Sequence, residues 1–492
     1  MKNRSLSKLN RSGALFQNDI AADNRAYAPT DSVGARLRTK SERTHISALG
    51  RNNTHAHTYS GTLGRKSTHA HTYAGTLGSA HSSANTYVGA STVARSYAGA
   101  YTGAGENVKG LLGYGKTDYP LLAIALTLSL LGLLFIYSAS SYGANLQFGD
   151  SFHYVKTQAV ALVIGVFAMT LITFLDVSKL QKLAPVLYII GLALLGMVFL
   201  PVIGVESYGA KRWLNLGFFT IQPSEYAKFF MVMAIASFAS KSDMRKFRNV
   251  LAVLAIGGAV CVLLMLEPNM SITICVAGTL FLMLFASGAK PLHLLLLAIP
   301  AVVGAVALVL MEPYRLQRLA AFLNPWNSPL EEGYQLIQSY YALGSGGLFG
   351  VGLFQSRQKY LFLPFAESDF ILSVIGEETG LFGVVVIVAL FIAFCYRGIR
   401  IARRASDRFS CYLALGITAV TGIQSLLNVA VVCGAIPPTG LPLPFMSAGG
   451  SSLVAYLGAT GVLLSIARNG TPYLRADSFK FTQKSKRTHN VR

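Results

Sequence analysis

Long apolar runs dominate the chain from Tyr119 onward, and each run ends at charge, glycine or proline. About 20 consecutive apolar residues can cross the hydrocarbon core of a bilayer, so each run predicts a membrane-spanning helix. The boundary at Glu267 and Pro268 is open, because one long broken helix would give the same pattern. We expect an all-α polytopic membrane protein whose ten helices occupy residues 117–470. The predicted spans are 119–140, 155–175, 183–204, 222–240, 248–266, 268–287, 291–311, 369–396, 409–434 and 445–467.

Lysine and arginine are spread unevenly over the loops between these spans. Loops that carry several alternate with loops that carry few, and the positive-inside rule places the basic loops and both termini in the cytoplasm. It follows that the polar stretch 312–368, between the seventh and eighth spans, is a large extracytoplasmic loop. The basic loops contain Lys179, Lys182, Lys241, Arg245, Lys246, Arg248, Lys290, Arg397, Arg400, Arg403, Arg404 and Arg408.

The composition agrees with a membrane protein and narrows its partners. Of 492 residues, 52% are hydrophobic and only 13% are charged, and the formal net charge is +21. The positive excess lies mainly in the first 116 residues, the C-terminal tail and the short loops. Such a distribution suits an anionic membrane surface better than a nucleic-acid groove, so we expect no nucleic-acid partner.

The N-terminal residues 1–116 have a different character from the rest of the chain. The segment "THAHTYSGTLG" at Thr54 returns as "THAHTYAGTLG" at Thr68, with almost no large aliphatic residues nearby. Such repeats cannot bury a core, which predicts a disordered cytoplasmic arm, and residues 471–492 predict a basic cytoplasmic tail. Metal binding is the alternative for the His-x-His pairs, but no cysteine or acid accompanies them. These pairs are His55 with His57 and His69 with His71.

The 312–368 loop contains the segment "GYQLIQSYYALGSGGLFGVGL", which has the spacing of a short amphipathic helix followed by glycines. Glycine permits close backbone approach, so we expect a cap folded onto the membrane face; an unstructured loop is the alternative. The loop ends at Asp369, which enters the eighth span. An ionisable residue at membrane depth is costly and is therefore a candidate for function. Glu377 and Glu378 follow about two turns deeper, too far to share one substrate atom with Asp369, and predict pairing within or between helices.

Cations in two outer segments are candidates for binding an anion. Lys211 and Arg212 stand beside Trp213 in an otherwise cation-poor loop, and Arg315 and Arg318 have helical spacing at the outer end of the seventh span. Arginine forks match phosphate oxygens and tryptophan favours the membrane interface, which together indicate a lipid phosphate headgroup. The alternative is that these side chains only anchor the protein at the interface.

A charged pair and a proline- and glycine-rich segment interrupt the apolar spans. Glu225 and Lys228 lie three residues apart on one helix face and predict an ion pair inside the bundle. The segment "GAIPPTGLPLPFMSAGGSS" breaks the backbone at membrane depth, which is tolerated only in protein or beside a cavity. We expect a polar cleft between the eighth and tenth spans, with Asp369 on its wall and Ser451 as a binding residue.

Several of these segments together resemble the SEDS family (shape, elongation, division and sporulation). The matching segments are "GAKRWLNLG", "QPSEYAKF", "EPNMSI", "YRLQRLAAFLNPW", "GYQLIQSYYALGSGGLFGVGLFQSRQK", "SDFILSVIGEETG" and "TGLPLPFMSAGGSS", in family order over about residues 119–470. The pieces "NPW" and "QSRQK" look more like the FtsW and SpoVE branch than RodA.

The resemblance implies ten spans, lipid II as substrate, and Asp369 as the match of the family's essential aspartate. This sequence departs from the family pattern at Ser368, Phe365 and Ala448, where Thr, Glu and Tyr are usual. These departures concern the exact positions of the side chains around Asp369, and they do not change which aspartate matches the family's essential one. The implied enzyme is an inverting peptidoglycan glycosyltransferase of cell division or sporulation in the bacterial cytoplasmic membrane.

The resemblance also implies partners and leaves alternatives. A class B penicillin-binding transpeptidase, divisome or sporulation proteins, and undecaprenyl-pyrophosphate-linked glycan are the expected partners. Chemistry requires a carboxylate for the attacking sugar hydroxyl, and cationic side chains or a divalent cation, Mg²⁺ or Mn²⁺, for the departing pyrophosphate; no metal ligands are assigned. A lipid II flippase and a non-catalytic scaffold for the transpeptidase are the competing function classes.

Overall fold

The computed structural model describes residues 117–201, 203–207, 210–215, 217, 220–311 and 313–470. The predicted arm 1–116, with its His-x-His pairs, and the predicted tail 471–492 lie outside these residues. All of the described residues belong to one compact unit. The assignment of the two terminal segments to separate disordered regions therefore stays a prediction.

Each of the ten predicted spans is a helix in the described part of the chain. These helices are α3 (Tyr119–Phe148), α4 (His153–Thr173), α5 (Val177–Met197), α6 (Pro223–Lys241), α7 (Phe247–Leu266), α8 (Met270–Ala286), α9 (Pro291–Leu310), α12 (Ile371–Arg403), α13 (Arg408–Val432) and α14 (Gly450–Asn469). Seven of them, α3, α4, α5, α7, α12, α13 and α14, are long and apolar enough to cross a membrane, and α8 and Pro291–Pro300 are shorter apolar helices. The polytopic α-helical prediction is confirmed.

The break at Glu267 is real, because α7 ends at Leu266 and α8 begins at Met270. Three other predicted ends were wrong. Helix α3 continues to Phe148, beyond the predicted end at residue 140, and stops where Gly149 adopts the left-handed conformation with φ 68°. Helix α12 continues to Arg403, beyond the predicted end at residue 396, because long arginine side chains can stay helical and still extend toward water. Helix α14 begins only at Gly450, not at the predicted residue 445, because Phe445 has φ 65° and Gly449 has φ 163°, both outside the helical region.

The predicted third span, 183–204, was wrong at both ends. Helix α5 ends at Met197 and is followed by β1 (Gly204–Ser207), β2 (Ala210–Asn215) and β3 (Thr220–Ile221). These strands form one antiparallel sheet in the order β1-β2-β3, with Val205 opposite Trp213 and Leu214 opposite Ile221. The segment expected to be a loop therefore has a fixed backbone that orients its cations.

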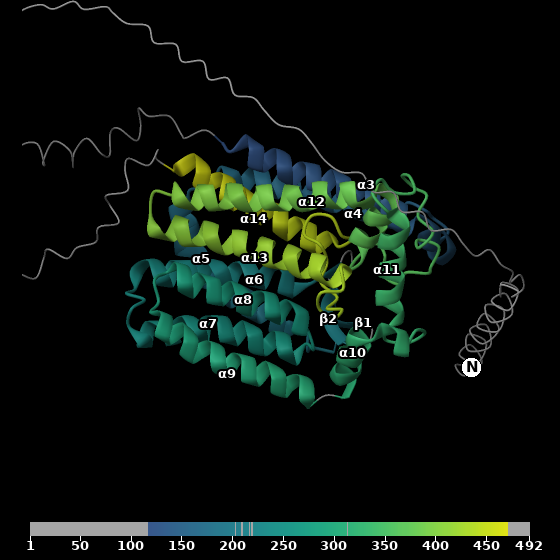
Figure 1. The fold of residues 1–492 in the computed structure, drawn as a ribbon. Coiled ribbons are helices and arrows are strands. Elements are labelled where there is room, and N and C mark those ends of the chain that lie inside the picture. The colour runs from purple at the N-terminus through teal and green to yellow at the C-terminus, as the bar shows by residue number, and fades with distance from the viewer. Residues whose placement is uncertain are drawn as a thin grey trace, which may run out of the picture. The chain divides into compact units, whose positions relative to one another are not determined.

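The large loop between α9 and α12 also contains ordered elements. Within the described residues it holds α10 (Pro313–Leu323), the short 3₁₀ helix η1 (Pro325–Asn327) and α11 (Tyr334–Gly346). Helix α11 packs on α12, so the unstructured alternative is wrong, and the position of this cap on the membrane face stays a prediction. Figure 1 shows α10, α11 and the strands together at the right-hand end of the helices, and we name this end the site end.

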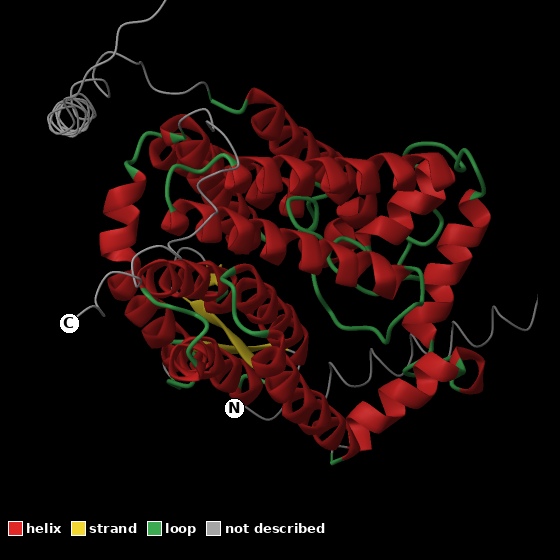
Figure 2. Cartoon of the chain, turned by 60° about the vertical axis from the view of Figure 1, so that its left-hand side comes forward, coloured by secondary structure: helices red, strands yellow, loops and turns green. Residues whose placement is uncertain are grey.

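The long helices pack side by side, and Figure 2 shows the small sheet among their ends. Helix α4 packs on α14, α5 on α6, and α12 on α13. Small residues allow the α4–α14 approach: a Cβ on Gly165 would lie 2.6 Å from Leu457 Cδ1, and one on Gly461 would lie 2.6 Å from the Met169 oxygen. Close approach through small residues is a common way for membrane helices to pack.

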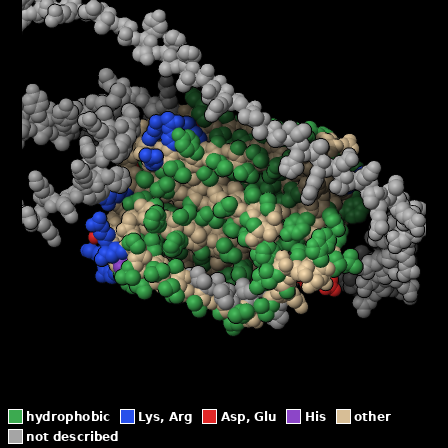
Figure 3. All heavy atoms as spheres, in the orientation of Figure 1, with side chains coloured by type: hydrophobic (Ala, Val, Ile, Leu, Met, Phe, Trp, Pro, Cys, Tyr) green, Lys and Arg blue, Asp and Glu red, His purple; other side chains and the backbone are tan. Residues whose placement is uncertain are grey.

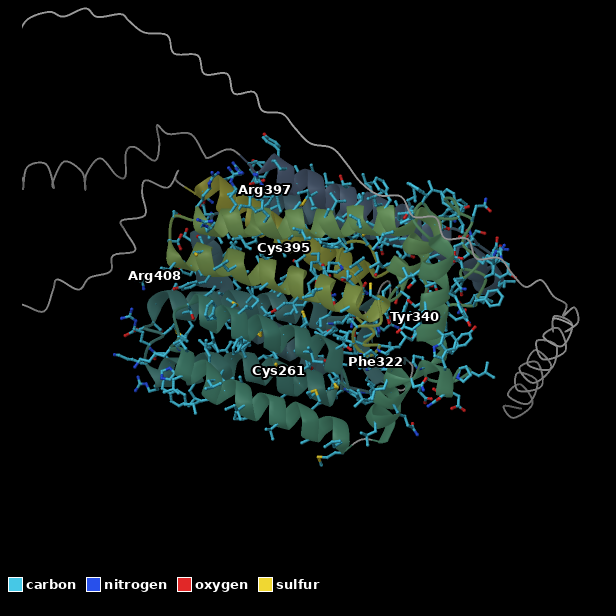
Figure 4. The ribbon with its side chains drawn as sticks, in the orientation of Figure 1. Cys261, Phe322, Tyr340, Cys395, Arg397 and Arg408 are labelled. Carbon is cyan, nitrogen blue, oxygen red and sulfur yellow. The ribbon has the colours of Figure 1, made fainter. Side chains whose placement is uncertain are left out.

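The two ends of the helices differ in charge. Figure 3 shows lysine and arginine side chains gathered at the left-hand end, whereas the lateral surface is largely hydrophobic. In Figure 4, Arg397 and Arg408 lie toward this end, while Phe322 and Tyr340 lie at the site end. We name the left-hand end the basic end. The sequence-based topology requires the basic loops to share one side of the membrane, and this arrangement agrees with it.

Candidate functional site

Asp369 lies at the site end, two residues before the first residue of α12. The Asn428 side chain on α13 donates to the backbone oxygen of Asp369 at 2.9 Å and to that of Leu441 at 2.7 Å. The Ser447 hydroxyl donates to the Ser368 oxygen, and the Ala448 amide donates to the Glu367 oxygen. The proline-rich segment 433–449 therefore fixes the backbone around Asp369 through specific hydrogen bonds.

The carboxyl group of Asp369 has a shifted pKa. Burial raises the pKa, while the Ser368 hydroxyl, which donates to Oδ1 at 2.8 Å, and the charges of Arg212 and Arg318 act in the opposite direction. The net shift is upward from the ordinary aspartate value. A carboxylate whose pKa moves toward neutrality accepts a proton more readily, which suits a general base.

Strand β2 and helix α10 bring two predicted cations toward Asp369. The Arg212 Nε donates to the Glu267 backbone oxygen at 3.3 Å, and its Nη2 donates to the Pro268 oxygen. Arg318 is exposed on α10, and its charge also acts on Asp369. The site end thus combines one carboxylate with two guanidinium groups, as expected for a site that handles a sugar hydroxyl and a phosphate.

The other predicted binding residues are placed differently. Lys211 and Trp213 flank Arg212 on β2, where a β-bulge interrupts the register with β1: Lys211 is opposite Glu206 and Trp213 is opposite Val205. The side chain of Arg315 lies outside the described residues. Ser451 is buried, accepts from the Gln222 amide at 3.2 Å and donates to the Thr220 oxygen at 3.3 Å. It thus links α14 to β3, and the structure does not bring it to Asp369.

The ion pair of Glu225 and Lys228 forms as the sequence indicates. The Lys228 amine lies 2.8 Å from Glu225 Oε2, and both side chains are fully buried. Lys228 also donates to Gln424 Oε1 at 2.8 Å and to the Tyr456 hydroxyl at 3.1 Å. Several partners for one buried charge reduce its desolvation cost, so this cluster connects α6, α13 and α14 as a structural unit.

Glu377 and Glu378 are fixed to the loop before α12. Glu377 Oε1 accepts from the Arg357 amide at 2.9 Å, and Glu378 Oε1 accepts from the Ser138 hydroxyl on α3. The Lys359 amine lies 3.9 Å from the same Glu378 oxygen. The prediction of pairing between helices holds for Glu378, whereas Glu377 instead binds loop amides, which the spacing along α12 could not reveal.

The glycine-rich segment fits against a break in α12. Gly380 has φ 67° and ψ −167°, which interrupts the helical geometry. A Cβ on Gly350 would lie 2.1 Å from the Glu378 oxygen, so no side chain fits there. The amides of Val351 and Leu381 donate to the oxygens of Glu377 and Gly347, both at 2.9 Å. The cap and α12 are therefore joined by backbone hydrogen bonds.

A cavity of about 460 Å³ lies beside this site, between the end of α3 and residues 359–367. Its lining includes Tyr154, Lys359 and Glu367, whose pKa is raised by burial and by the Asp369 charge. We expected a cleft between the eighth and tenth spans with Asp369 on its wall. Asp369 is not among the residues that line this cavity, so the cleft between the eighth and tenth spans stays a prediction.

Sequence reasoning missed two residues of the site end, Asn428 and Glu267. Asn428 is an amide within an apolar helix, which was a usable signal. Glu267 is 1% exposed, and burial raises its pKa to about 8 while the Arg212 charge lowers it. Its position just after an apolar run gave no indication that it would be buried beside Arg212. Among the described residues, no three His, Cys, Asp or Glu side chains converge to hold a metal ion.

The fold and site end define a member of a known family of polytopic membrane proteins. The sequence model of the FtsW, RodA and SpoVE family, described as "Cell cycle protein", matches residues 119–471, and the chain belongs to this family. It is 41% identical to Stage V sporulation protein E of Bacillus subtilis (strain 168), over 72% of this chain and 98% of that protein. It is 39% identical to Probable peptidoglycan glycosyltransferase FtsW of Geobacter metallireducens, over 73% of this chain and 96% of that protein.

Solved structures show the same fold. A chain from the structure described as "Structural coordination of polymerization and crosslinking by a peptidoglycan synthase complex" matches with a TM-score of 0.61 and 29% identity, covering 72% of this chain and 98% of that one. The rod shape determining protein RodA of Thermus thermophilus matches with a TM-score of 0.54 and 27% identity, covering 73% of this chain and 99% of that one. The chain is thus a bacterial membrane protein of this family.

Proposed function

We propose that this protein is a peptidoglycan glycosyltransferase that polymerises lipid II into glycan strands. The observation that carries the proposal is the carboxyl group of Asp369, held at the site end with Arg212 and Arg318 acting on it. The names of the relatives, a sporulation protein and a probable peptidoglycan glycosyltransferase, support the same activity in cell division or in sporulation.

The reaction follows from the groups at the site end. Asp369 accepts the proton of an attacking sugar hydroxyl, whose oxygen forms a bond to the anomeric carbon of the second sugar. The bond from that carbon to the lipid pyrophosphate breaks, and the pyrophosphate takes the electron pair. Arg212 and Arg318 stabilise the negative charge that develops on it. One base and one good leaving group suffice for a single displacement with inversion, so no covalent intermediate with the protein forms.

A divalent cation, Mg²⁺ or Mn²⁺, is the further group that this chemistry can use. The described residues do not supply three convergent ligands for it, so they do not form a metal site from protein groups alone. We therefore assign no ligands and assign the charge stabilisation to the arginines. Lys211 and Arg315 are retained as secondary candidates for the same anion.

Partners and orientation complete the proposal. The first of the matching solved structures concerns polymerization and crosslinking by one peptidoglycan synthase complex, which supports a class B penicillin-binding transpeptidase as the partner of this chain. Divisome or sporulation proteins are the further expected partners. The gathering of lysine and arginine at one end supports cytoplasmic termini in the bacterial cytoplasmic membrane, with the site end outside (Figure 3).

The direct test is purified protein, prepared free of other polymerases, mixed with fluorescent lipid II, with the products separated on a gel. We expect a ladder of glycan polymers from the wild type. Proteoliposomes carrying lipid II report flipping in parallel. Flipping without polymer would assign the chain to the transporter class, and neither activity in the presence of the transpeptidase would favour the scaffold.

A further inference from the structure

The turn between α7 and α8 contains polar groups that lack hydrogen-bond partners. Both carboxyl oxygens of Glu267 are buried without a partner among the described residues, as is the amide nitrogen of Asn269. Glu267 is 1% exposed and Asn269 is 5% exposed. Buried polar groups in native proteins are nearly always hydrogen-bonded, so such a cluster indicates a site that is completed by a ligand or by water.

This turn lies in the same site as Asp369. Arg212 binds the backbone oxygens of Glu267 and Pro268, and its charge acts on both Glu267 and Asp369. On the other side, the Ser271 hydroxyl donates to the Thr439 oxygen. The next residue, Gly440, is so close that a Cβ on it would lie 3.3 Å from Asp369 Oδ2. The turn is thus connected to Asp369 electrostatically through Arg212 and by packing through residues 439–440.

The charge state of Glu267 follows from its surroundings. Burial raises its pKa to about 8, and the opposing charge is that of Arg212 on β2. Helix α8 and residues 433–449 contribute no Asp, Glu, Lys, Arg or His to this end. On α6, the nearby charges Glu225 and Lys228 pair with each other. Among the other charges of the site end, Asp369 and Arg318 act on each other, Lys211 precedes Arg212 on β2, and Lys359 and Glu367 line the cavity beside Asp369.

We propose that Glu267 acts as a neutral carboxylic acid that donates a hydrogen bond to a phosphate oxygen of the lipid-linked substrate held by Arg212. The Asn269 amide supplies a second donor. The proposal rests on the proposed function and adds a positioning residue to it. No proton is transferred to the substrate: the phosphate keeps its charge, and the carboxyl proton is shared across one hydrogen bond.

The sign of the pH dependence follows directly. Glu267 carries its proton below its pKa and loses both the proton and the donor as the pH rises through about 8. A bound phosphate anion disfavours the carboxylate and raises the pKa further. Rising pH should therefore weaken binding of the phosphate group, and the effect should appear in kcat/KM, which reports groups of the free enzyme.

The test compares the wild type with Glu267→Gln and Glu267→Ala from pH 6.5 to 9.5, by the lipid II polymer assay. One pH unit above the pKa about one tenth of the molecules keep the proton, so wild-type kcat/KM at pH 9 should fall about tenfold. Glutamine is a permanent neutral donor, so Glu267→Gln should lack this alkaline decrease. Glu267→Ala should be about tenfold less efficient at neutral pH, mainly through KM, without the decrease. The exposed Glu331→Gln is the matched control and should follow the wild type.

A binding measurement separates this inference from the activity itself. Calorimetry of the purified protein with farnesyl pyrophosphate, and with farnesol as the phosphate-free control, should show pyrophosphate affinity that falls above pH 8 in the wild type only. If the wild type makes no polymer but shows this binding pattern, the proposed function fails and the role of Glu267 stands. The inference is overturned if kcat/KM of the folded Glu267→Gln variant still decreases at alkaline pH as it does in the wild type. It is also overturned by a Glu267→Gln variant whose activity is lost and recovers with added Mg²⁺, because Glu267 would then be an ionised cation ligand.

Discussion

Replacement of Asp369 by asparagine is the most direct perturbation of the site end. Asparagine keeps the size of the side chain, and its Oδ1 can still accept the Ser368 hydroxyl that now lies 2.8 Å away. The basic oxygen and the negative charge are lost. General-base assistance typically contributes about 100- to 10,000-fold, so polymer formation should decrease by that order.

The stability of Asp369→Asn, unlike its activity, should increase or remain unchanged. Because the folded-state pKa of Asp369 is raised, its ionised form is disfavoured by folding at neutral pH, and a neutral side chain removes that cost. The thermal unfolding midpoint of Asp369→Asn in detergent should therefore not fall below that of the wild type. This result separates lost chemistry from lost structure.

Asp369→Glu tests how strictly the carboxylate is positioned. Its extra methylene moves the carboxylate by about 1 Å, which can cost on the order of 100-fold at a positioned site. Gly440 leaves little room, since even a Cβ there would lie 3.3 Å from Oδ2. The assay is lipid II polymerisation by purified variants, with binding of the transpeptidase as a control for folding. Wild-type polymer levels from a verified Asp369→Asn preparation would refute the assignment of Asp369 as the base.

Three further predictions concern the cations, the topology and the N-terminal arm. Changing Arg212 or Arg318 to alanine should remove a charge-assisted contact of roughly 1.5 to 3 kcal/mol and lower efficiency about ten- to hundredfold, with only partial rescue by lysine; unaltered efficiency in both would reassign them to interface anchoring. Single cysteines at Asn327 and Ser406 should react with an impermeant thiol reagent from outside and from inside respectively, and the reverse pattern would contradict the orientation. Deletion of residues 1–110 should leave folding and polymerisation intact, as measured by the same gel assay, and loss of polymer from a well-folded truncation would show a direct role.

The sequence predicted the helices well because membrane spanning imposes a simple length and polarity rule. It did not predict β1–β3, since strands of two to six residues between helices leave no comparable pattern. Asp369 and Arg212 were recognised because charge is unusual in their segments. Glu267 was not, because its contact with Arg212 joins the α7–α8 turn to β2, which lies more than 50 residues earlier in the chain. The hydrogen bonds of Ser451 were also not predictable, since only the folded chain places Thr220 against it, and its role in binding stays a prediction.

Backbone hydrogen bonds join residues 347–352 of the cap to residues 377–382 of α12, so the two segments are expected to move together. Residues 347–352 bond to α12 on both sides of Gly380, and Asp369 lies at the end of the short arm before that break. Displacing the cap sideways without moving this arm would require several of those bonds to break at once, at roughly 0.5 to 1.5 kcal/mol each. Binding of another protein to residues 347–352 would therefore also fix the position of the Asp369 carboxylate.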